Sequence, residues 1–263
     1  MNMWTRIGNA SILIENAELL PSPLQGLIRL EGNPATSGFQ ATIEIQWAEA
    51  KGWKVEIAER ENHHSFGRFS YLMEVDPLRG HIVLRFAQVP QSSDIYWLQR
   101  DIFGVIACLS GQVMLHGSSV TKDGHTFLFC GQSGAGKSTI ARLLEAEGWS
   151  VINDEVNWLF HRDGEWNLVN QRYWFGAAEV PFLSLTRLLL LEQSQDCFIA
   201  PPPLRPETFA RLLASHLSID LQYDFLHARA EALKQLVETF PVNVLRFNLD
   251  SQALLRLLCT PTG

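Results

Sequence analysis

The chain has 263 residues, enough for one large domain or two small ones with a sizeable core. Its net charge of −7 argues against a general nucleic-acid-binding protein, which needs a basic face. No apolar run approaches the roughly 18 residues of a membrane span, and the first residues lack the apolar core of a signal peptide. We therefore expect a soluble, cytoplasmic protein without nucleic-acid or membrane partners, with its four scattered cysteines reduced.

Residues 1–92 are typical of a small, mainly antiparallel β domain without a catalytic signature of its own. Short segments of strand length alternate between apolar and polar residues and are separated by proline- and glycine-containing turns. His63 and His64 are adjacent, so on a strand they would point to opposite faces, and we expect loop histidines rather than a metal pair. The predicted strands are Ser11–Glu15, Leu27–Glu31, Ala41–Ile45, Trp53–Ile57 and His81–Phe86.

Residues 93–263 are predicted to form an α/β domain with a mixed sheet. A helix from about Asp94 to Leu109 precedes two strands, 112–120 and 125–130, which are joined by the tight turn Lys122–Gly124. This hairpin gives the second strand an antiparallel neighbour. The later elements are a strand at Trp149–Glu155, a hairpin of Val156–Phe160 and Trp166–Val169, a strand at Leu185–Leu191, helices opening at Pro206 and spanning Tyr223–Phe240, a strand at Val242–Phe247 and a short helix after Asp250.

The strand 125–130 leads into a complete Gly-x-x-x-x-Gly-Lys-[Ser/Thr] phosphate-binding motif, or P-loop. Glycines let the backbone bring its N–H groups close to phosphate oxygens, and the following helix points its positive end at the anion. Lys137 would contact the β- and γ-phosphates, and the Ser138 hydroxyl would coordinate Mg²⁺. We therefore expect ATP and Mg²⁺ as cofactors, with the nucleotide bound by Gly131, Ser133, Gly134, Ala135, Gly136, Lys137, Ser138 and Thr139.

Three further side chains are candidates for the chemistry beside the phosphates. Asp154 and Glu155 end the strand that follows the P-loop helix, where a carboxylate would bind Mg²⁺ or act as a base; the alternative is that they only cap a turn. Asp154 is the preferred metal ligand and catalytic carboxylate. His116 lies on the hairpin strand beside the P-loop strand, where the alternative is a structural hydrogen bond.

A family resemblance rests on three segments: Leu115–Val120 with its His-Gly pair, the P-loop, and Gly148–Glu155. Together they resemble the kinase core of HPr kinase/phosphorylase, and more closely the HPr-kinase-like serine kinases encoded with lasso peptides. The resemblance covers about 93–263, and its specific part is about 115–155. It departs from the family in having Glu155 for an aspartate and in lacking the second Arg- and Gly-rich signature.

The resemblance implies a mixed-sheet P-loop kinase fold akin to phosphoenolpyruvate carboxykinase, preceded here by the small β domain. It also implies catalytic roles for His116, Lys137, Asp154 and Glu155. The expected function is ATP-dependent transfer of the γ-phosphoryl group to a hydroxyl, with a serine of a peptide or small protein as the acceptor. A small-molecule kinase or carboxykinase-like enzyme and a non-catalytic, nucleotide-gated binding module are the alternatives. Homo-oligomerisation is left open.

Overall fold

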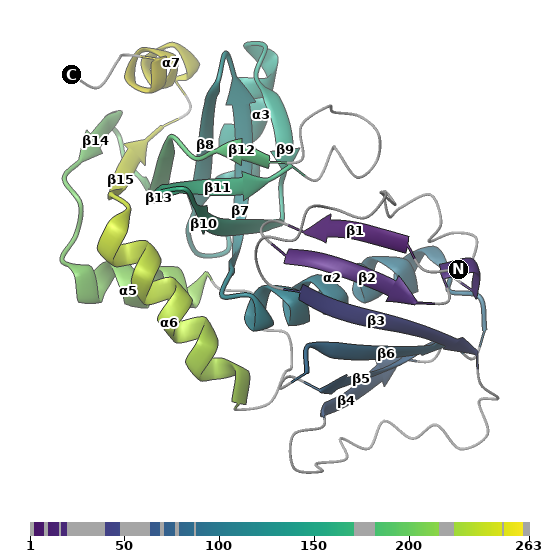
Figure 1. The fold of residues 1–263 in the computed structure, drawn as a ribbon. Coiled ribbons are helices and arrows are strands. Elements are labelled where there is room, and N and C mark those ends of the chain that lie inside the picture. The colour runs from purple at the N-terminus through teal and green to yellow at the C-terminus, as the bar shows by residue number, and fades with distance from the viewer. Residues whose placement is uncertain are drawn as a thin grey trace. The chain divides into compact units, whose positions relative to one another are not determined.

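The computed structural model describes residues 3–7, 10–15, 17–19, 40–47, 64–68, 71–76, 79–86, 88–170, 182–215, 224–248 and 250–259. The chain divides into two compact units (Figure 1). The first comprises Met1–Gln112 with Arg172–Glu179 and Ile219–Ala228, and the second comprises the remainder. The strands predicted at Leu27–Glu31 and Trp53–Ile57 lie outside the described residues, as does His63.

The first unit contains a six-stranded mixed sheet of order β1-β2-β3-β6-β5-β4. Two central pairings, β2 with β3 and β3 with β6, are parallel, and the other three are antiparallel. The prediction of a mainly antiparallel domain did not include these parallel pairs. The strands are β1 (Met3–Ile7), β2 (Ala10–Glu15), β3 (Gln40–Trp47), β4 (His64–Arg68), β5 (Tyr71–Asp76) and β6 (His81–Phe86), with a 3-10 turn η1 at Ala17–Leu19.

Helix α2 (Ser92–Leu109) packs with this sheet and contributes to its core. The Tyr71 hydroxyl on β5 donates to Asp101 Oδ2 on α2 at 2.5 Å, and both residues are buried. Residues of β5 and β6 alternate between buried and half-buried, so one face of the sheet is apolar and the other is polar and accessible. The predicted second domain begins at 93 and includes this helix, whereas the first compact unit extends to Gln112.

The second unit is built on a nine-stranded mixed sheet, which confirms the mixed α/β class. Strands β8, β13 and β15 are mutually parallel at its centre, and the flanking pairings are antiparallel. The order is β12-β11-β10-β7-β8-β13-β15-β14, and β9 also pairs with β7. The strands are β7 (Val113–Lys122), β8 (His125–Cys130), β9 (Ser150–Asn153), β10 (Val156–Arg162), β11 (Glu165–Val169), β12 (Phe182–Ser184), β13 (Arg187–Gln193), β14 (Phe198–Ala200) and β15 (Val242–Phe247).

Helices lie on both faces of this sheet, because its central strands bury side chains on both sides. Helices α3 (Lys137–Ala146) and α7 (Ser251–Cys259) pack on one face, through Ile140 and Leu254 against Phe129. Helices α5 (Arg205–Ala214) and α6 (Asp224–Thr239) contribute Leu212 and Leu233 to the core on the other face. We call these the α3 face and the α5 face.

The hairpin turns and the N-cap of the last helix in this unit lie where the sequence predicts them. The hairpin turns contain Asp123 with φ 50° and Gly124 with φ 80°, and Asp163 with φ 53° and Gly164 with φ 85°. Such left-handed pairs match the twist of adjoining strands. At the start of α7, Asp250 Oδ1 accepts from the Ala253 amide at 3.1 Å. Among the described helices, none combines the length and apolarity needed to cross a membrane.

Candidate functional site

The glycine-rich segment Gly131–Gly136 connects the end of β8 to the start of α3. Leu190 on β13 lies opposite both Cys130 on β8 and Val244 on β15, so the three parallel strands end at the same edge of the sheet. The strand, loop and helix therefore follow one another in the order expected from the sequence. Ligands of open α/β sheets bind at this carboxyl edge.

Two of the loop glycines have conformations or surroundings that exclude a side chain. Gly136 has φ 99°, and a Cβ there would lie 2.7 Å from Phe247 Cζ. A Cβ at Gly131 would lie 2.9 Å from the Ala135 Cβ. Within the loop, the Ala135 amide donates to the Gln132 carbonyl at 3.1 Å. The loop is thus tightly wound, and its backbone approaches its surroundings closely.

Lys137, the first residue of α3, places its buried ammonium group over this loop. The residue is only 7% exposed, and its Nζ donates to the carbonyls of Gly131 and Gln132 at 3.0 Å each. An ammonium group has three N–H donors, so these two bonds fix its position and leave one donor for a ligand. A buried lysine is costly unless it is paired, which fits a group kept for an anion.

The start of α3 adds backbone N–H donors to the same place. Its N-cap, Gly136, provides no capping side chain, and the first turn holds no acidic residue. The first amides of a helix lack partners within it, and the helix dipole is positive there. Ser138 in this turn is half-buried and Thr139 is exposed. The chain thus offers amides, a lysine and a serine hydroxyl, a donor set suited to phosphate and Mg²⁺.

Two hollows flank the loop. The larger, of about 540 Å³, is bounded by Gly131–Ala135, the end of β13 and the Arg211 side of α5. The smaller, of about 260 Å³, lies by Gly136 and Thr139 against Phe247 and Asn248. Between them, Gln193 Nε2 donates to the Gly134 carbonyl at 3.0 Å. Ser133, Gly134 and Ala135 thus line the first hollow, and Thr139 the second.

Asp154 is oriented by a buried serine of β7. β9 and β10 both pair with the same edge of β7. Asn153 lies opposite Ser119 and Val156 opposite His116, so the register continues across Asp154 and Glu155. Asp154 therefore lies opposite Ser118, whose buried hydroxyl donates to Asp154 Oδ1. Ser118 also pairs with Phe129 on β8, so it lies on the α3 face. Asp154 thus shares a face with Lys137 and lies two strands, roughly 10 Å, from the loop-bearing strand.

Glu155 and His116 are placed differently from each other. Glu155 lies in the bend between β9 and β10; its carbonyl accepts from the Gly117 amide at 3.1 Å, and its side chain is exposed. His116 pairs with Val156 and lies on the α3 face with Asp154. Its amide donates to the Ser215 carbonyl at 2.7 Å. Asp154 is the carboxylate that Ser118 holds on the face of the lysine.

A charged cluster beside the larger hollow is not predicted by the sequence pattern; Glu192 and Arg211 line the hollow. Near the end of β13, Glu192 Oε2 is 2.9 Å from Arg246 Nε, and Glu192 Oε1 is 2.9 Å from Arg211 Nη1. The hydrogen bond from Arg246, followed by that from Arg211, lowers the pKa of the Glu192 carboxyl. These residues come from β13, α5 and β15, so only the long-range pairing of the strands brings them together.

Cys130, the last residue of β8, is a buried neighbour of the loop. Burial raises the pKa of its thiol to about 12, against the smaller lowering effect of Lys137. The thiol therefore stays protonated and is no nucleophile.

On the same α5 face, Asn157 Nδ2 donates to the Gly117 carbonyl and its Oδ1 accepts from Ser119 Oγ, each at 2.6 Å. This buried network fixes β7 beside β10 where the carboxylates occur.

Comparison with known proteins yields likenesses among solved structures alone. No protein-family model matches the chain, and no curated protein sequence matches it. Among solved structures, the HPr(Ser) kinase/phosphatase from Coxiella burnetii aligns with 54% of this chain and 89% of its own, at 13% identity and a TM-score of 0.30.

Proposed function

We propose that this protein is an ATP-dependent kinase that transfers a γ-phosphoryl group to a hydroxyl, with a serine of a peptide or small protein as the acceptor. The observation that carries the proposal is the buried Lys137 ammonium, held by two loop carbonyls at the uncapped start of α3. Phosphoryl transfer depends mainly on positioning and on stabilising charge, and this arrangement supplies both at one point.

The residues of the loop fit the phosphates of a nucleotide. The free amides of the first turn and the remaining Lys137 donor would bind phosphate oxygens, and Ser138 with Asp154 would hold Mg²⁺. The ion would neutralise charge that develops on the transferred group.

Asp154 is suited to receive the proton of the attacking hydroxyl. A serine hydroxyl has a pKa far above 7, so a base must accept its proton as the bond to phosphorus forms. Ser118 fixes one oxygen of Asp154 and leaves the other available. His116, on the same face, would help to position the hydroxyl, and the exposed Glu155 would have a supporting role.

The test is single-turnover transfer from [γ-³²P]ATP to an arrayed library of serine-containing peptides, with MgATP binding measured separately by calorimetry. We expect Lys137→Ala to abolish nucleotide binding. Asp154→Asn should slow transfer about 10²-fold or more while binding changes much less, and Glu155→Gln should be milder. Asp163→Asn, an exposed turn carboxylate, is the matched control and should behave as wild type.

The outcomes separate the alternatives. Unchanged MgATP binding in Lys137→Ala would contradict the nucleotide site itself. Tight MgATP binding without transfer to any peptide would favour a binding module, and phosphorylation confined to small hydroxylated molecules would favour a small-molecule kinase. If Glu155→Gln abolishes transfer and Asp154→Asn does not, the assignment of the base is wrong.

A further inference from the structure

Three side chains of metal-ligating types come together on the polar face of the first unit's sheet. None of them has a role in the proposed kinase reaction. They are Glu15 on β2, Glu44 on β3 and His81 on β6, three strands that are neighbours in the sheet. One ligand atom from each lies within 4.8 Å of the other two, and all three side chains are half-buried. Their spacing in the sequence is irregular, because parallel pairing of the strands creates the cluster.

The sheet register places two of these charges unfavourably close. Glu15 is the direct partner of Glu44 in the parallel pairing of β2 with β3. Like charges directly opposite each other on neighbouring strands destabilise a sheet. His81 pairs with Thr42, two residues before Glu44, so its ring lies on the same face. A cation between the carboxylates would turn this repulsion into attraction.

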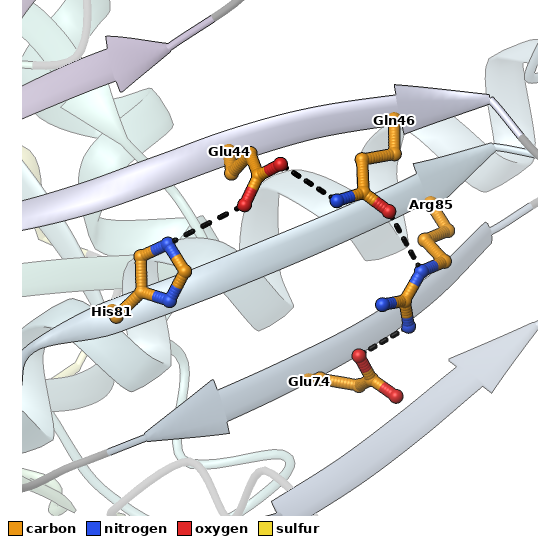
Figure 2. A network of polar contacts seen from close by, with 5 residues as sticks. All are labelled: Glu44, Gln46, Glu74, His81 and Arg85. Carbon is orange, nitrogen blue, oxygen red and sulfur yellow. Dashed lines mark hydrogen bonds and ion pairs between the residues drawn. The ribbon is translucent and has the colours of Figure 1, made fainter.

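A chain of hydrogen bonds orients Glu44 toward His81 (Figure 2). Gln46 Nε2 donates to Glu44 Oε1 at 2.6 Å, and Arg85 Nε donates to Gln46 Oε1 at 2.9 Å. Because arginine only donates, it fixes which end of the Gln46 amide faces Glu44. Arg85 also pairs with Glu74, which balances its charge. Outer partners of this kind hold metal-binding carboxylates in place.

The second Glu44 oxygen is at a distance from His81 that suits shared coordination better than a hydrogen bond. Glu44 Oε2 and His81 Nε2 are 3.7 Å apart, beyond the usual range of about 2.7–3.2 Å for a hydrogen bond. Ligand atoms about 2.0–2.1 Å from a tetrahedral Zn²⁺ lie roughly 3.4 Å from one another. The side chains, 34% and 28% exposed, are open to an ion from solvent.

We propose that Glu15, Glu44 and His81 bind one Zn²⁺ ion, with water completing its coordination. Imidazole disfavours Mg²⁺ and Ca²⁺ and suits Zn²⁺, and three protein ligands plus water is a common Zn²⁺ arrangement. The ion would connect β2, β3 and β6. The site does not depend on the proposed kinase activity.

The test is a Zn²⁺ titration of the full, chelator-treated chain by calorimetry at pH 7. We expect one saturable site, weakened at least 10-fold by each of Glu15→Gln, Glu44→Gln and His81→Gln, and about 10-fold by Gln46→Ala through loss of orientation. Zn²⁺ should raise the Tm of the wild type but not of the ligand variants. His125→Gln, which removes an exposed histidine at the start of β8, is the matched control and should leave the affinity unchanged.

A second measurement needs no variant. In ¹⁵N-labelled wild-type protein, Zn²⁺ should shift the Nε2 resonance of His81, and Co²⁺ in its place should give visible bands of a nitrogen- and oxygen-ligated ion. Failure of the His81 resonance to respond would overturn the proposal, even if the variants do not fold. So would a Zn²⁺ affinity that the three ligand substitutions leave unchanged or that follows His125. Phosphoryl transfer should be the same with and without Zn²⁺ at the level that fills this site.

Discussion

Replacing Gly136 by alanine should destabilise the second unit more than the same change at any open left-handed glycine. An L-residue in left-handed backbone costs about 1–2 kcal/mol, and φ 99° lies beyond the usual left-handed minimum. The new Cβ would also lie 2.7 Å from Phe247 Cζ, and Phe247 is only 3% exposed. Forcing an extra methyl group into a packed site costs about 1–3 kcal/mol. The sum is a loss of about 2–5 kcal/mol in unfolding free energy.

The matched control is Gly164→Ala. Gly164 has φ 85° and no atom within 4 Å of an added Cβ, so only the backbone cost of about 1–2 kcal/mol applies. Urea unfolding followed by circular dichroism would measure both variants, and the double variant Gly136→Ala/Phe247→Leu should recover part of the loss. Equal destabilisation of the two single variants, with no recovery in the double one, would refute the argument that Phe247 packs against the loop.

Two further predictions concern ionisable groups near the loop. Because the folded pKa of Glu192 is lowered from its ordinary 4.5, its stabilisation is complete above about pH 4.5 and is lost as the pH falls below that value. Between pH 5 and pH 3 the unfolding free energy should therefore fall less in Glu192→Gln than in wild type. The exposed control Glu165→Gln should resemble wild type. An equal pH dependence of the unfolding free energy in Glu192→Gln and wild type would contradict the ion pairs. Cys130, with its pKa raised to about 12, should resist iodoacetamide at pH 8 in the folded chain, whereas the half-buried Cys197 should react. Peptide mass mapping would measure the labelling of each cysteine. Rapid labelling of Cys130 would show that β8 opens.

The sequence predicts those parts of the site that depend on local pattern. The bounds of β8, the loop after it and the turns at Asp123–Gly124 and Asp163–Gly164 follow from short-range chemistry, and the structure has them at these positions. β5 has apolar residues at Tyr71, Met73 and Val75, an alternation that is itself typical of a half-buried strand. The short strands β12 and β14 have three residues each, too few for a periodic signal.

Long-range pairing explains what the sequence could not give. β2, β3 and β6 are parallel neighbours in the sheet but lie far apart in the chain, and the segments between them carry no information on strand pairing. The cluster of Glu15, Glu44 and His81 therefore cannot be predicted from the sequence. The same holds for Glu192, Arg211 and Arg246. The roles of His116, Lys137, Asp154 and Glu155 in catalysis remain predictions that the kinetic experiments above address.

The pairing of β7 has a consequence for the order of folding. His116, Ser118, the glycine-rich loop, Lys137 and Asp154 all belong to the continuous stretch 116–155, and they are joined by a tight hairpin and one helix. Contacts between residues close in the chain form fastest, because closing short loops costs little entropy. The β13 residues that line the larger hollow, Glu192 among them, come from a strand that must pair with β8 across a long stretch of chain. During refolding, the groups proposed for chemistry should therefore assemble first, and the hollow beside them should close last.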